Sequence, residues 1–152
     1  MTIMRSGRTR LAAIAVGLAA SAVPALSHSA SAADQQCNFV LNTLKAVDVQ
    51  EPRTRGDEIF IRLDGVAFPS SGNVRFAANG VVRSANAFGS PVVGFADDNP
   101  LSVNVIENDI LFNDVIGNTK NLECTGDQTD QVLVFKETGV KYLMTYDVDL
   151  LS

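Results

Sequence analysis

Apolar and polar side chains alternate along most of the chain after residue 32, and this period of two is the strongest constraint on its fold. In segment 58–64, the residues Ile59, Ile61 and Leu63 share one face. A second such face lies near the end of the chain and consists of Tyr142, Met144, Tyr146 and Val148. No window of eleven residues keeps a helical stripe. Alternation of this kind predicts strands that bury one face.

Turn-forming dipeptides separate these alternating segments. Asp64-Gly65 predicts a tight hairpin, and Asn79-Gly80 predicts a second one that pairs segment 73–77 with segment 81–84. The segment 131–149 has the pattern of a closing hairpin. Short strands at regular spacing, about eight in all, are typical of β-sandwiches. The sequence therefore predicts an all-β fold, an antiparallel two-sheet sandwich of about eight strands.

The first 32 residues have the pattern of a cleaved secretory signal peptide. They carry three arginines and no acid, then an apolar run from Leu11 to Ala20, then Ala30-Ser31-Ala32. The apolar run is shorter than the roughly 20 residues that a membrane-spanning helix needs. We expect residues 33–152 to form one secreted domain. Without the three arginines, nine basic side chains remain against 17 acidic ones, which gives a net charge of −8.

Cleavage would also remove the single histidine of the chain, His28. Without imidazole, the mature domain cannot build Ser-His-Asp or Cys-His catalytic sites or histidine-ligated zinc centres. The acidic balance argues against nucleic acid as a partner, because nothing resembles a basic stripe. We therefore expect a protein that is not an enzyme. A hydrolase that uses only carboxylates stays open, but the lack of tryptophan leaves few aromatic platforms for a sugar.

The domain has two cysteines, Cys37 and Cys124. Export would place them in an oxidising compartment, where a disulfide is favoured over two free buried thiols. The bridge would close a loop of nearly ninety residues and stabilise the fold by about 4–5 kcal/mol in the chain-entropy treatment.

Acidic side chains gather in two polar segments, 48–58 and 107–117. In the second, Glu107 and Asp109 are two residues apart and would point the same way on a strand, and Asp114 could return from the far side of the loop. Calcium takes six to eight oxygen ligands, which such loops can supply. The spacing does not fit an EF-hand loop.

The two segments resemble the calcium-binding loops of the C2 (C-two) domain, a calcium- and lipid-binding β-sandwich. Segment 56–63, Gly-Asp-Glu-Ile-Phe-Ile-Arg-Leu, is similar to that family's first loop and following strand, and segment 105–117 is similar to its third loop. Position by position, the resemblance implies calcium ligation by Glu51, Asp57, Glu107, Asp109 and Asp114. Small secreted actinobacterial proteins of unassigned function contain similar patches.

The sequence also departs from the family pattern. Glu51 and Glu107 stand where the family usually has Asp, Glu58 replaces a Pro, and the interval from Asp109 to Asp114 is one residue short. Solvated turns on an acidic sandwich that no longer binds an ion are therefore the alternative to a calcium site.

Three apolar residues, Ile110, Leu111 and Phe112, lie between the acids of the second segment. In the family that the chain resembles, apolar residues at this loop tip enter membranes; here the triplet could instead fold back onto the end of the sandwich. We expect a secreted, non-catalytic, calcium-binding monomer that contacts a lipid, glycan or protein surface through the 107–114 loop. The alternative is a secreted inhibitor or effector that binds a protein without metal.

Overall fold

The computed structural model describes residues 35–50, 56–108 and 113–151. These residues form eleven strands and one short 3-10 helix, η1 (Ala85–Phe88). The strands are β1 (Gln36–Asp48), β2 (Asp57–Leu63), β3 (Val66–Phe68), β4 (Val74–Phe76), β5 (Val82–Ser84), β6 (Val92–Ala96), β7 (Leu101–Asn108), β8 (Asn113–Val115), β9 (Lys120–Leu122), β10 (Gln128–Glu137) and β11 (Val140–Leu151). The all-β prediction is confirmed.

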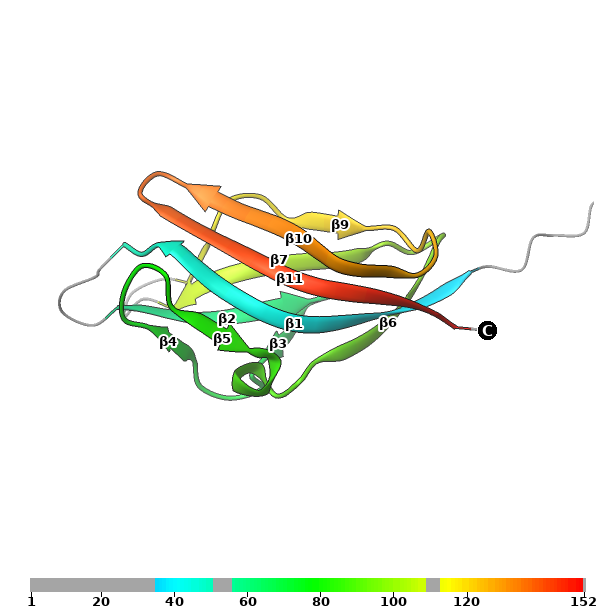
Figure 1. The fold of residues 1–152 in the computed structure, drawn as a ribbon, viewed down its shortest axis with the longest axis horizontal. Coiled ribbons are helices and arrows are strands. Elements are labelled where there is room, and N and C mark those ends of the chain that lie inside the picture. Colours follow the sequence, from blue (N-terminus) through cyan, green and yellow to red (C-terminus); the bar gives the residue numbers. More distant parts are fainter. Residues whose placement is uncertain (1–34, 51–55, 109–112, 152) are drawn as a thin grey trace, which may run out of the picture. The chain divides into compact units, whose positions relative to one another are not determined.

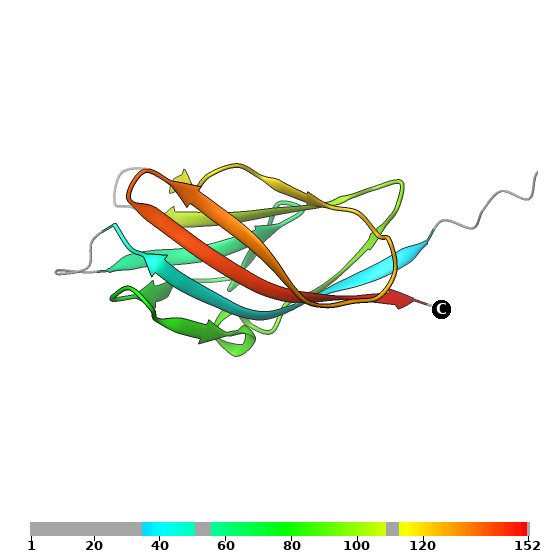
Figure 2. The ribbon, with the colours of Figure 1, turned by 45° about the horizontal axis from the view of Figure 1, so that its top comes forward.

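The strands form two antiparallel sheets that pack face to face (Figures 1 and 2). Sheet A has the order β10-β11-β1-β5, and β6 also pairs with β1. Its centre is the long pairing of β1 with β11, in which Leu44 lies opposite Met144. The predicted closing hairpin is confirmed as β10 and β11.

Sheet B has the order β3-β2-β7-β8, with β4 also paired to β2 and β9 also paired to β7. The Asp64-Gly65 hairpin is confirmed between β2 and β3, and both residues have positive φ, 46° and 83°. Five strands, namely β3, β4, β5, β8 and β9, have three residues each. Three of these, β3, β4 and β5, fall in segments that the sequence predicts as strands. The strand number exceeds the expected eight because the alternation does not mark β6, β8 and β9.

The predicted hairpin at Asn79-Gly80 is wrong. Its two arms belong to different sheets, because β4 pairs with β2 and β5 pairs with β1. Two backbone hydrogen bonds join this turn to β1 instead: the Gly80 amide donates to the Ala46 carbonyl at 2.7 Å, and the Ala46 amide donates to the Val81 carbonyl at 2.9 Å. The turn therefore carries the chain from one sheet to the other.

The core lies between the sheets and is built by the inward-facing side chains of both. Its largest fully buried members are aromatic: Tyr142, Phe39, Phe76, Phe88 and Phe135. The predicted disulfide between Cys37 and Cys124 is present. It joins β1 of sheet A to the segment after β9 of sheet B, so it fastens the two sheets to each other. In the described part of the chain, no helix is long and apolar enough to cross a membrane.

Candidate metal-binding end of the sandwich

Two candidate ligands, Asp57 and Glu107, lie at the same end of sheet B. Asp57 begins β2 and Glu107 is the penultimate residue of β7, and the antiparallel register places Ile59 directly opposite Glu107. Asp57 is two residues from Ile59, so both carboxylates lie on the face that packs against sheet A, as diagonal neighbours. The start of β2 and the end of β7 are at the left in Figure 1.

Both acidic segments of the sequence join the sheet at this end. One connects Gln50 to Gly56 and the other connects Asn108 to Asn113. Five of the candidate residues lie outside the described residues, namely Glu51, Asp109, Ile110, Leu111 and Phe112. The structure thus brings Asp57 and Glu107 together at this end of the sandwich.

Asp57 is held by hydrogen bonds from two parts of the chain. Its side chain is 1% exposed. The Gln50 amide donates to Oδ1 at 3.0 Å, and the hydroxyl of Tyr142, on β11 of sheet A, donates to Oδ2 at 2.6 Å. The ring of Tyr142 meets Phe76 edge to face, with centroids 5.2 Å apart. Asp57 is therefore a polar contact between the two sheets and, with Glu107, one of two buried acids among the described residues.

The pKa of Tyr142 depends on its burial and on the two nearby carboxylates, Asp57 and Glu107. Burial of the phenol raises its pKa far above the usual value, and the hydrogen bond to Asp57, the charge of Asp57 and the charge of Glu107 raise it further. The ionised phenolate would lack hydration and would face two carboxylates. Tyr142 therefore stays protonated at neutral pH and acts as a hydrogen-bond donor.

Glu107 and Asp114 are cross-strand partners. Glu107 is 4% exposed, and its direct partner in the register of β7 with β8 is Asp114, which is exposed. Asp57, Glu107 and Asp114 thus share one face of sheet B. Within residues 35–50, 56–108 and 113–151, no three His, Cys, Asp or Glu side chains are grouped closely enough to hold a metal ion. Any cage would need ligands from the two remaining segments.

Sequence reasoning missed the role of Tyr142. The alternation of β11 marks it only as an inward-facing core residue, and it lies 85 residues from Asp57 along the chain. No local pattern could signal that its hydroxyl meets a carboxylate, because the contact arises only when the sheets stack. The sequence signal that remains is a tyrosine among apolar residues on a buried face, where its hydroxyl needs a partner.

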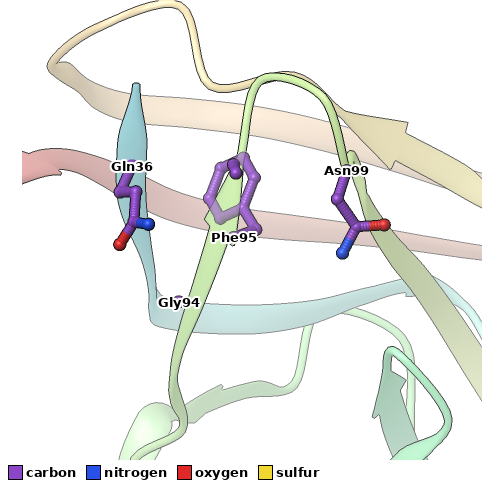
Figure 3. Close-up of a pocket in the computed structure, with 5 residues that line it drawn as sticks. Gln36, Gly94, Phe95 and Asn99 are labelled. Carbon is purple, nitrogen blue, oxygen red and sulfur yellow. The ribbon is translucent and has the colours of Figure 1, made fainter. Parts of the chain in front are cut away.

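A shallow pocket of about 360 Å³ lies at the opposite end of the sandwich (Figure 3). It is lined by Gln36 at the start of β1, by Gly94, Phe95 and Ala96 of β6, and by Asn99. The ring of Phe95 belongs to the core and is almost fully buried. The lining contains no ionisable side chain, so we assign the pocket no chemistry.

The comparisons with known proteins identify no family for this chain. No family model and no curated protein matches it. Among solved structures, it is similar to a structure of the two C2 domains of extended synaptotagmin 2, with 12% identity, a TM-score of 0.48 and coverage of 97% of this chain. A structure of a C2 domain has 12% identity and a TM-score of 0.45, and the match covers 78% of this chain and 99% of that one. The chain spans about half of the extended synaptotagmin 2 structure, 49%. We draw no functional conclusion from TM-scores of this size.

Replacing Tyr142 with phenylalanine should destabilise the protein by about 2 kcal/mol, because the buried Asp57 carboxylate loses a donor at 2.6 Å. Urea denaturation at pH 7 measures the change. Tyr146→Phe is the matched control, because this tyrosine is on the same strand and stacks on Phe39, and no hydrogen bond of its hydroxyl is found among the described residues. Equal losses in the two variants would show that the Asp57 contact contributes nothing specific.

Proposed function

We propose that the protein is an exported, non-catalytic β-sandwich that binds calcium at one end and uses that end to contact a lipid or another surface. The observation that carries the proposal is the pair of buried carboxylates, Asp57 and Glu107, on the inner face of sheet B. Both acidic segments enter the sheet beside this pair. A divalent cation would offset the repulsion between carboxylates gathered there.

The chemistry of the described residues fits a hard cation. Carboxylate oxygens are the ligands that calcium prefers. Asp57 accepts hydrogen bonds from Gln50 and Tyr142, but an ionised carboxylate has about four lone-pair sites, so these two bonds do not by themselves exclude an ion. The proposed ligand set is Glu51, Asp57, Glu107, Asp109 and Asp114. When bound, the ion would supply charge neutralisation and order to the two loops.

The proposal also covers the surface that contacts the partner and the export of the protein. The triplet Ile110, Leu111 and Phe112 would lie beside the ion and meet the partner surface, since exposed apolar clusters mark contact sites. Residues 1–32 would direct export and be removed. N-terminal sequencing of protein recovered from the medium of an exporting host tests this step, and an intact Met1 in the exported protein would contradict it.

Calcium should raise the melting temperature of the purified protein. Binding only to the folded state stabilises it by about 2.7 kcal/mol when calcium is a hundredfold above Kd, which corresponds to a rise on the order of 10 °C for a domain of this size. Asp109→Asn should remove most of the rise. Asp98→Asn, which changes an exposed aspartate in a turn between β6 and β7, is the matched control and should leave it unchanged.

An unchanged melting temperature in 10 mM calcium, about tenfold or more above the Kd of typical extracellular modules, would contradict the calcium site. If the site holds, co-sedimentation with vesicles of phosphatidylserine and phosphatidylcholine tests the surface contact. Binding that needs calcium and is lost in Leu111→Ser supports lipid contact, and no binding in calcium directs the search to a glycan or protein partner.

The second candidate is a secreted domain that binds a protein without metal. It is favoured by the two donors that Asp57 already receives from Gln50 and Tyr142. Such a buried acid can be a structural contact between sheets. A protein whose melting temperature is insensitive to calcium, together with the destabilisation expected for Tyr142→Phe, would support this candidate.

A further inference from the structure

The outer face of sheet A is unusually apolar for a sheet surface turned to solvent. Side chains alternate in direction along a strand, so the residues between the core positions point outward. Four exposed valines are among them, with exposed fractions from 42% to 58%, and two half-buried residues lie between them. We call these six residues the outer valine face: Val82, Val92, Val132, Val134, Val40 and Leu143.

The strand register makes these residues neighbours. Val134 lies opposite Leu143, Leu143 opposite Lys45, and Lys45 opposite Val82, so one row crosses four strands. A second row pairs Val40 with Val92. The outer faces of antiparallel sheets are commonly polar, and contiguous exposed apolar surface marks contact sites.

Charges of opposite sign lie at the two ends of the outer valine face. Lys136 and Lys141 are at the end near the turn between β10 and β11, and Lys45 lies one row further in, opposite Leu143; these are three of the four lysines in the chain. Lys136 and Lys141 are direct cross-strand partners, a like-charge pairing that is unfavourable in an isolated sheet. One acid, Asp48, lies opposite Lys141. Asp149 points outward from β11 at the other end, and Asp147 lies one row further in, opposite Val40.

We propose that the outer valine face is the interface of a two-fold symmetric dimer of this chain, with the strands of the two copies running antiparallel. In a two-fold interface the same patch serves both copies and must complement itself. A patch of apolar side chains with its lysines in one half and with Asp147 and Asp149 in the other half meets this requirement. A purely acidic or purely basic partner would match only one end.

The strand register within one copy, together with the two-fold symmetry, determines which residues of the two copies face each other. We place the two-fold axis perpendicular to the strands, along the row that contains Thr43 and Thr145. This row lies midway between the two charged ends. Lys141 and Asp149 are each four residues from Thr145 on β11, so Lys141 of one copy lies over Asp149 of the second. Val82 lies over Val92 of the second copy in the same way, because the two valines lie one row to either side of the axis.

The size of the face sets the expected affinity. Four strands about 4.8 Å apart and a length of about eight residues give roughly 500 Å² for each copy. The two copies together bury roughly 1,000 Å², the lower limit of specific interfaces. We expect a dimer with a Kd in the micromolar range rather than the monomer that the sequence predicts. Its formation does not depend on calcium.

Sedimentation equilibrium of the protein recovered from an exporting host, in EDTA, tests the dimer. The wild-type protein should dimerise in the micromolar range. Because the interface is symmetric, Lys141→Glu and Asp149→Lys each create two pairs of like charges across it. Each variant should therefore raise the dimer Kd about tenfold or more. The double variant, and an equimolar mixture of the two single variants, should regain the wild-type Kd.

Lys120→Glu is the matched control, because it makes the same charge change on β9 of sheet B and should leave the Kd unchanged. The rescue by the double variant separates loss of the interface from loss of folding. A monomer at several hundred micromolar would overturn the proposal, as would a dimer whose Kd does not respond to the single variants. Binding of the monomer to phosphatidylserine vesicles that is lost in Lys141→Glu would also overturn it, in favour of a lipid surface.

Discussion

Replacing Cys37 and Cys124 with alanine should destabilise the protein by about 4–5 kcal/mol. The disulfide spans 87 residues, and a cross-link that closes so long a loop removes much of the conformational entropy of the unfolded chain. Domains of this size have total stabilities of about 5–15 kcal/mol, so the loss could leave little of the folded state at 37 °C. Urea denaturation of the two proteins measures the difference.

Alanine is chosen because both cysteines are buried, and serine would add a polar group to the core. Wild-type protein kept in reducing agent is the matched control and should denature at nearly the same urea concentration as the variant. A loss below about 1 kcal/mol would mean that the unfolded chain is already restricted without the bridge.

Replacing Gly56 with alanine should destabilise the fold by about 3–5 kcal/mol or prevent folding. Gly56 precedes β2, has a φ of 66°, and a Cβ atom at this position would lie 2.4 Å from the carbonyl oxygen of Phe76 and 2.6 Å from Cα of Ala77. The positive φ costs about 1–2 kcal/mol for a residue with a side chain. The contact is with backbone, which cannot move aside without disturbing the pairing of β4 with β2, and overpacking adds about 1–3 kcal/mol.

Gly65→Ala separates these two contributions. Gly65 has a φ of 83°, but a Cβ atom there would meet nothing within 4 Å. We expect a loss of only about 1–2 kcal/mol in this variant. Thermal denaturation of both variants gives the comparison, and equal melting temperatures would show that the close approach of Gly56 to β4 has no energetic consequence.

The strands β2, β7 and β11 could be predicted because each shows its buried face over five or more residues. Tyr142, Met144, Tyr146 and Val148 are all buried, as their alternation indicates. The three-residue strands show no period. The error at Asn79-Gly80 has a different cause: turn residues report the local backbone angles, and they do not report which strand receives the hydrogen bonds on either side.

The candidate site could be predicted only in part. The composition of the two loops identifies a set of carboxylates, and the structure separates them by environment: Asp57 is 1% exposed while its neighbour Glu58 is exposed. Glu58 points to the outer face of sheet B and accepts a long hydrogen bond from Asn73, at 3.5 Å. Adjacent acids on a strand point to opposite faces, so their exposure depends on which face meets the second sheet.

By itself, the sequence determined the β class, the inward faces of the long strands and the single possible disulfide, because alternation is a local property and two cysteines allow one pair. Tertiary structure alone decided how the strands pair, that Tyr142 meets Asp57, and that apolar residues from five strands form one outer face with lysines in one half and aspartates in the other. These features depend on contacts between residues far apart in the chain, and such contacts are set by register and sheet packing rather than by any local pattern.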